Sequence, residues 1–195
     1  GICNETFGNW PFKRACEFAA DAGYTGLEIA PFTLGENPNE LSSNQRGELR
    51  RTIAQAGLEC IGLHWLLAKT AGLHVTSPDA DTRGRTISYL TDLARLCRDL
   101  GGKTLVFGSP QQRNLVAEVT EQDAHSFLQE VFGALVPVLE ETDTVITLEP
   151  LAPIETDILT TADETRQLID LIGSPHIRLH LDVKAMSDEQ KSIPE

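Results

Sequence analysis

The stretch TVITLEPLAPIET, residues 144–156, is the most informative part of the chain about both architecture and chemistry. An apolar run of strand length ends on a carboxylate, Glu149, and a loop stiffened by two prolines then carries a second acid, Glu155. A similar run, IRLHLD, ends on Asp182. The spacing between Glu149 and Asp182 suits one βα unit, which predicts two neighbouring parallel strands that end at the same edge of a sheet.

The same alternation of strand and helix extends over the rest of the chain. The predicted strands are Ile2–Cys3, Thr25–Ala30, Leu58–His64, Thr104–Gly108, Thr144–Glu149 and Ile177–Asp182. The predicted helices are Pro11–Ala22, Ser43–Ala56, Thr82–Leu100 and Glu121–Glu141, with a fifth that opens at a Thr161-Ala-Asp-Glu164 capping box. Short apolar strands, each followed by a helix, predict an α/β fold with a parallel sheet.

A closed barrel fits this pattern better than an open doubly wound sheet. No G-x-G-x-x-G follows the first strand, whereas polar residues end several strands, as barrel enzymes require. We therefore expect residues 1–195 to form a single domain, a (β/α)₈ TIM barrel. Because such a barrel typically needs about 250 residues, we also expect it to be truncated here after about six βα units.

Composition excludes several classes of partner. The formal net charge is −13, and the 16 Lys and Arg are scattered, which argues against nucleic acid. No apolar run is long enough for a membrane span. The four cysteines, Cys3, Cys16, Cys60 and Cys97, form no C-x-x-C pair. We expect them to be small buried hydrophobes in a reducing cytoplasm, with no zinc or disulfide role.

The carboxylates at the strand ends are the candidate metal ligands. Adjacent parallel strands lie about 4.8 Å apart, so Glu149 and Asp182 are close enough to share one cation. Oxygen donors favour Mg²⁺ and Mn²⁺, with Co²⁺ and Zn²⁺ as alternatives. The competing interpretation is that these acids are solvated or cap the following helix. His64 and Trp65 end the third strand and suit a sugar, as a hydrogen-bonding group and a stacking face, or else they are a packed pair.

Further polar residues follow the first two strands. Glu28 lies on the second strand as a mouth residue with no assigned role, and Asn4 and Glu5 are candidates for lining the same mouth.

The sequence resembles the xylose isomerase-like sugar phosphate isomerase/epimerase superfamily. The resemblance covers essentially the whole chain, through ICNETF, GLEIAP, GLHW, EPLAPIET and LHLDVKAM. The EPLAPIET run looks like the one in D-tagatose 3-epimerase, related ketose 3-epimerases and hydroxypyruvate isomerases. Two departures stand out: Ala152-Pro153 replaces the common Asn-Arg, and Ala185 stands where the epimerases carry a His.

The resemblance implies roles for three residues. Glu149 corresponds to the Glu that binds metal and transfers a proton, Asp182 to the metal-binding Asp, and Glu155 to the Glu that contacts substrate near its C1 oxygen. A further His ligand and a second catalytic Glu of the family come from strands seven and eight, beyond residue 195.

The predicted function is a divalent-metal-dependent isomerase or epimerase that acts through an enediolate. Its substrate would be a sugar, a sugar phosphate or a small keto-hydroxy acid. The alternatives are an inosose dehydratase-like lyase, a non-catalytic sugar-binding barrel, and an endonuclease IV-like DNA repair enzyme, which the missing His and the negative charge disfavour. Neither nucleic acid nor membrane is expected as a partner, and homo-oligomerisation stays open.

Overall fold

The computed structural model describes residues 1–35 and 37–188. Its centre is a six-stranded sheet in the order β1-β2-β3-β4-β5-β6, and every neighbouring pair is parallel. The strands are β1 (Ile2–Cys3), β2 (Gly26–Ile29), β3 (Glu59–His64), β4 (Thr104–Phe107), β5 (Val145–Leu148) and β6 (Ile177–Leu179). The helices are α1 (Phe12–Asp21), α2 (Ser43–Gln55), α3 (Ala80–Leu100), α4 (Glu121–Thr142) and α5 (Ala162–Ile172).

The helices begin and end where the chain supplies caps. Ser42 and Thr120 each form a capping box, and the Asp79 carboxylate accepts two amides at the start of α3. Gly101 ends α3 in the left-handed conformation, at φ 91°. The apolar faces of the helices meet the strands in one continuous core, with Leu63, Leu105, Phe107 and Ile146 among its fully buried members.

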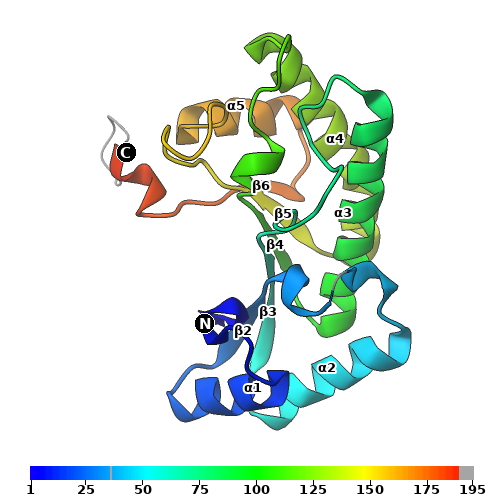
Figure 1. The fold of residues 1–195 in the computed structure, drawn as a ribbon, viewed down its shortest axis with the longest axis vertical. Coiled ribbons are helices and arrows are strands. Elements are labelled where there is room, and N and C mark those ends of the chain that lie inside the picture. The colour runs from blue at the N-terminus through cyan, green and yellow to red at the C-terminus, as the bar shows by residue number, and fades with distance from the viewer. Residues whose placement is uncertain (36, 189–195) are drawn as a thin grey trace.

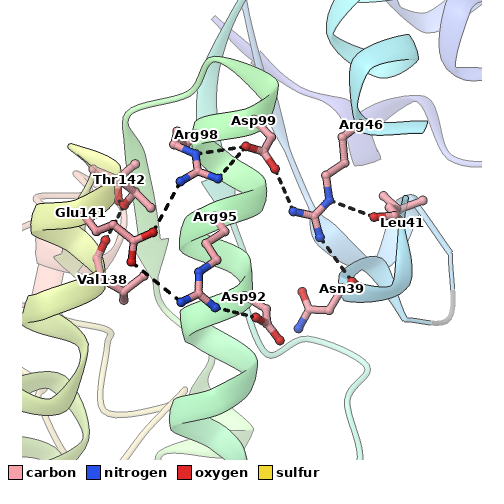
Figure 2. Close-up of polar contacts among 11 residues, drawn as sticks. Asn39, Leu41, Arg46, Asp92, Arg95, Arg98, Asp99, Val138, Glu141 and Thr142 are labelled. Carbon is pink, nitrogen blue, oxygen red and sulfur yellow. Dashed lines mark hydrogen bonds and ion pairs between the residues drawn. The ribbon is translucent and has the colours of Figure 1, made fainter. Parts of the chain in front are cut away.

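The sheet curves, and α2, α3 and α4 lie along its outer side (Figure 1). An ion-pair network holds these three helices together, as Figure 2 shows. Arg46 of α2 donates to Asp99 of α3 at 2.9 Å, while Arg98 and Arg95 of α3 approach Glu141 of α4 at 3.7 and 3.8 Å. The open side of the sheet is left for the segments that follow the strands.

The predicted α/β barrel architecture is confirmed: strands and helices alternate, and each strand lies beside the next one along the chain. The predicted strands differ from the observed ones chiefly at the sixth strand, which was expected to run to Asp182. β6 ends at Leu179, so Asp182 does not close it but lies in the segment that follows. Among residues 1–35 and 37–188, no helix is long and apolar enough to cross a membrane.

The prediction for the cysteines is confirmed in part. Cys16 and Cys97 are buried, whereas Cys3 and Cys60 are only half-buried. Cys3, however, lies in a polar cluster: its sulfur is 3.2 Å from a carboxylate oxygen of Glu28 and 3.5 Å from Nδ1 of His64. The prediction that Cys3 is only a small buried hydrophobe is therefore wrong.

Candidate active site at the strand ends

Glu149 lies directly after β5, and the end of β4 makes room for its side chain. Its amide donates to the Phe107 carbonyl at 3.0 Å, which extends the ladder between the two strands by one residue. A Cβ on Gly108 would lie 2.5 Å from Oε2 of Glu149, well inside contact distance. Glycine is therefore the only residue type at position 108 that leaves room for the Glu149 carboxylate where it is observed.

The surroundings of Glu149 disfavour its charge. Burial and the nearby negative charge of Asp182 raise the pKa of Glu149 to about 7, and the Arg113 guanidinium opposes this shift only in part. A carboxylate in such a position is suited to exchange protons near neutral pH or to accept a cation.

Asp182 is placed by the turn that follows it. Its Oδ1 accepts the amides of Lys184 at 2.7 Å and Ala185 at 3.1 Å, at the start of a 3₁₀ turn over Ala185–Asp188. The helix-cap interpretation of Asp182 therefore holds for one oxygen. In the part of the chain that the structure describes, no hydrogen bond occupies the other oxygen, Oδ2.

Glu155 lies between these two acids in the chain and faces the same hollow. Its Oε1 accepts the Lys184 amine at 2.7 Å, and this bond raises the pKa of Lys184. Its Oε2 is buried and has no hydrogen-bond partner among the described residues. A buried carboxylate oxygen without a donor is costly, which indicates a position that a ligand completes.

These acids line one hollow of about 210 Å³. All of its walls come from segments that follow β3, β4, β5 and β6, so it opens at the carboxyl ends of the strands. Its lining residues are Trp65, Gly108, Ser109, Pro110, Glu149, Leu151, Glu155, Asp182, Lys184 and Ala185. The structure thus brings together four of the five predicted site residues, all except His64.

His64 lies beside this hollow, with its ring held by acids. Nε2 is 2.9 Å from Glu5, and Nδ1 is 3.6 Å from Glu28 and 3.5 Å from Cys3. Neither ring nitrogen is free, so a hydrogen bond from His64 to a sugar would require one of these contacts to break.

Trp65, unlike His64, has side-chain surface available for contact with a ligand. Half of its surface is exposed, and its backbone adopts φ 52°, an uncommon conformation for a bulky residue. Its ring stacks beside the His64 ring at 6.1 Å. Trp65 also borders a second hollow of about 530 Å³, formed with Glu5, Trp10, Phe32 and Lys69.

Arg113 is a site residue that sequence reasoning missed. It is fully buried, and its guanidinium donates to the Glu149 carbonyl at 2.7 Å and to the Thr156 hydroxyl at 3.3 Å. Burial lowers its pKa to about 10, against the opposing effect of Glu149. Arg113 therefore fixes the backbone on both sides of the Glu149 loop. It occurs in a loop with no periodic pattern, so nothing in the sequence marks it.

The comparisons with known proteins agree with this architecture. The sequence profile of the xylose isomerase-like TIM barrel family matches residues 16–193. The chain belongs to this family. A probable ketose 3-epimerase from Synechocystis sp. is 27% identical over 173 residues, which cover 88% of this chain and 56% of that protein. An L-ribulose 3-epimerase from Mesorhizobium japonicum is 25% identical over 75% of this chain and 48% of that protein.

A solved structure of similar fold is the D-psicose 3-epimerase of Clostridium cellulolyticum H10 with D-tagatose. It matches with a TM-score of 0.84 at 21% identity, over 99% of this chain and 66% of that one. This xylose isomerase-like chain spans about half the length of the two curated relatives described above.

Proposed function

We propose that the protein is a divalent-metal-dependent isomerase or epimerase that acts on a sugar, a sugar phosphate or a small keto-hydroxy acid. The observation that carries this proposal is the convergence of Glu149, Asp182 and Glu155 on one hollow at the carboxyl ends of the strands. The names of the relatives support the sugar class, since both are ketose 3-epimerases by description. We also propose that residues 1–195 belong to one barrel domain.

The donor atoms fit a hard divalent cation. Glu149 and Asp182 present carboxylate oxygens to the same hollow, and the negative charge of Asp182 helps to raise the pKa of Glu149. Such an oxygen-rich pair suits Mn²⁺, Mg²⁺ or Co²⁺, with Zn²⁺ as an alternative. When bound, the cation would act as a Lewis acid and stabilise the negative charge that develops on the substrate oxygens.

Each side chain around the hollow would have a separate role in the reaction. Glu149 would remove the proton next to the substrate carbonyl and return it, which is the step shared by isomerisation and epimerisation. Glu155 would accept a hydrogen bond from a substrate hydroxyl at its unpaired Oε2. Trp65 would stack on the apolar face of the sugar, and His64 would border the substrate through its ring.

Solvent exchange tests this proposal directly. The full-length protein would be incubated with Mn²⁺ in D₂O with D-tagatose, D-fructose or L-ribulose, and deuterium at the carbons next to the carbonyl would be followed by NMR. We expect exchange in the wild type and a loss of about 10³-fold in Glu149→Gln, because the base is removed. Asp182→Asn should chiefly raise the Mn²⁺ concentration that half-activates the enzyme.

The control is Glu48→Gln, which changes an exposed acid of α2, a helix on the outer side of the sheet. It should leave exchange unchanged. Wild-type exchange in Glu149→Gln would refute the catalytic role. The inosose dehydratase-like alternative uses the same proton removal, and it would be recognised by release of water from keto-inositols without epimerised product. A non-catalytic barrel would bind sugar with no exchange at all.

A further inference from the structure

A second group of side chains with metal-binding chemistry lies at the ends of the first three strands, and none of its members lines the carboxylate hollow. Cys3 is the last residue of β1, Glu28 lies on β2 directly opposite it in the register, and His64 is the last residue of β3. Glu5, in the turn after β1, completes the group. Cys3, Glu5 and His64 offer ligand atoms within 4.8 Å of one another.

Three atoms of this group form a nearly regular triangle. Cys3 Sγ lies 3.2 Å from Glu28 Oε2 and 3.5 Å from His64 Nδ1, and the same oxygen of Glu28 lies 3.6 Å from that nitrogen. Zn²⁺ bonds of about 2.3 Å to sulfur and about 2.0–2.2 Å to nitrogen and oxygen, at tetrahedral angles, separate the donor atoms by about 3.3–3.6 Å. The observed spacing fits one ion above the three atoms with little movement.

The fourth residue occupies the position of an orienting partner. Glu5 Oε2 lies 2.9 Å from Nε2 of His64, the ring nitrogen on the far side from the triangle. Metal-binding histidines commonly donate their second ring nitrogen to a carboxylate, which fixes the tautomer that leaves the first nitrogen free to bind. Glu5 would therefore hold the His64 proton on Nε2 and point the Nδ1 lone pair at the ion.

We propose that Cys3, Glu28 and His64 bind a thiophilic divalent cation, with Zn²⁺ as the ion expected, and that Glu5 positions the His64 ring. The thiolate sets the selectivity, because Mg²⁺ and Mn²⁺ prefer oxygen donors. Binding would release the Cys3 proton to solvent as the S–Zn bond forms. Three protein ligands leave a fourth position open, which is typical of zinc sites that bind water or substrate.

The two candidate metal sites share no residue. The thiolate site uses β1, β2 and β3, whereas the carboxylate hollow uses the segments after β5 and β6 for its acids. The Glu5 side chain also lines the larger hollow beside Trp65, so an ion held by Cys3, Glu28 and His64 would lie next to that hollow. The inference does not depend on turnover at Glu149.

Cobalt spectroscopy gives the decisive test, since a thiolate bound to Co²⁺ produces a near-ultraviolet charge-transfer band that oxygen ligands do not. The full-length protein would be stripped with EDTA and titrated with Co²⁺. We expect the band in the wild type, its loss in Cys3→Ser, and its retention in Cys60→Ser and Glu149→Gln. Zn²⁺ should displace Co²⁺ and abolish the band, whereas Mg²⁺ in excess should not.

A second variant covers the case in which Cys3→Ser fails to fold. Glu5→Gln keeps all three ligands, so the band should remain while the Co²⁺ affinity falls about 10–100-fold. No band in the wild type, or a band of equal intensity in Cys3→Ser, would overturn the proposal and leave a hydrogen-bonded cluster only.

Discussion

Gly108 sets the space in which the Glu149 carboxylate lies. A methyl group there would meet Oε2 at 2.5 Å, and the strand register next to it leaves the backbone little freedom to move. We predict that Gly108→Ala displaces the carboxylate and lowers kcat/KM of the full-length enzyme by about 10²-fold, because misplacement of a catalytic group by about 1 Å is that costly. Steady-state kinetics with saturating Mn²⁺ would measure this.

The matched control is another glycine with open space around it. Gly84 lies inside α3, and a Cβ there would meet nothing within 4 Å. Gly84→Ala should leave kcat/KM unchanged and raise the free energy of unfolding by about 0.5–1 kcal/mol, because alanine is the better helix former. If Gly108→Ala also left kcat/KM unchanged, the Glu149 carboxylate would not need its observed position.

One buried arginine links the loop after β4 to the loop after β5 through hydrogen bonds. Arg113 lies in the loop after β4, yet it donates to the carbonyls of Glu149 at 2.7 Å and Leu159 at 3.5 Å, on the other side of the acidic loop. Arg113→Met would remove the Arg113 donor from the Glu149 carbonyl, whereas the Leu159 carbonyl would keep the Leu151 amide at 3.2 Å. We predict a loss of about 2–4 kcal/mol in the free energy of unfolding by urea. Arg166→Met, in an exposed pair with Asp170, should cost less than about 0.5 kcal/mol.

A histidine–carboxylate pair joins the starts of α4 and α5. His125 Nε2 lies 3.1 Å from Glu164, whose carboxylate also accepts the amides of Leu159 and Thr160, and Glu121 faces the same histidine. The hydrogen bond to Glu164 raises the pKa of His125 above its ordinary value of 6.5. Burial opposes ionisation of Glu164, but the bonds that it accepts lower its pKa below 4.5.

The signs of these shifts define a pH window. A raised His pKa gives stability that is present below pH 6.5 and is lost as pH rises through the folded-state pKa, and a lowered Glu pKa gives stability that is lost in acid. A double-mutant cycle of His125→Gln and Glu164→Gln should show a coupling of about 0.5–1 kcal/mol near pH 5.5. The coupling should fall as pH rises through the folded-state pKa of His125. A coupling that stays constant with pH would contradict the ion pair.

The helices and the order of strands could be predicted from periodicity and capping residues, because those signals are local. The apolar run before Asp182 predicts that this residue ends a strand. In the structure, its carboxylate instead accepts the amides of Lys184 and Ala185 in a turn, three residues after the end of β6. The polar cluster of Cys3, Glu28 and His64 has no local signature. Its members are 25 and 61 residues from Cys3 in the chain, and only strand pairing brings them together.

A cation bound between Glu149 and Asp182 would stabilise the whole molecule. Because Glu149 and Asp182 follow neighbouring strands, a cation between them would tie β5 to β6 and bind only the folded state. Mn²⁺ at about 100 times its Kd should add about 2.7 kcal/mol to the free energy of unfolding. In a domain of this size that corresponds to a rise in Tm of about 5–10 °C, which calorimetry on the EDTA-treated protein would measure.

Two variants assign this stabilisation to its site. Asp182→Asn should lose most of the Mn²⁺-induced rise in Tm, because it removes a charged ligand, whereas Cys3→Ser should keep it, since Mn²⁺ prefers oxygen donors to a thiolate. An equal rise in Asp182→Asn would mean that Mn²⁺ binds elsewhere on a chain whose formal charge is −13. No rise in the wild type would mean that the two carboxylates do not converge on a cation, and the metal-dependent mechanism would fail with it.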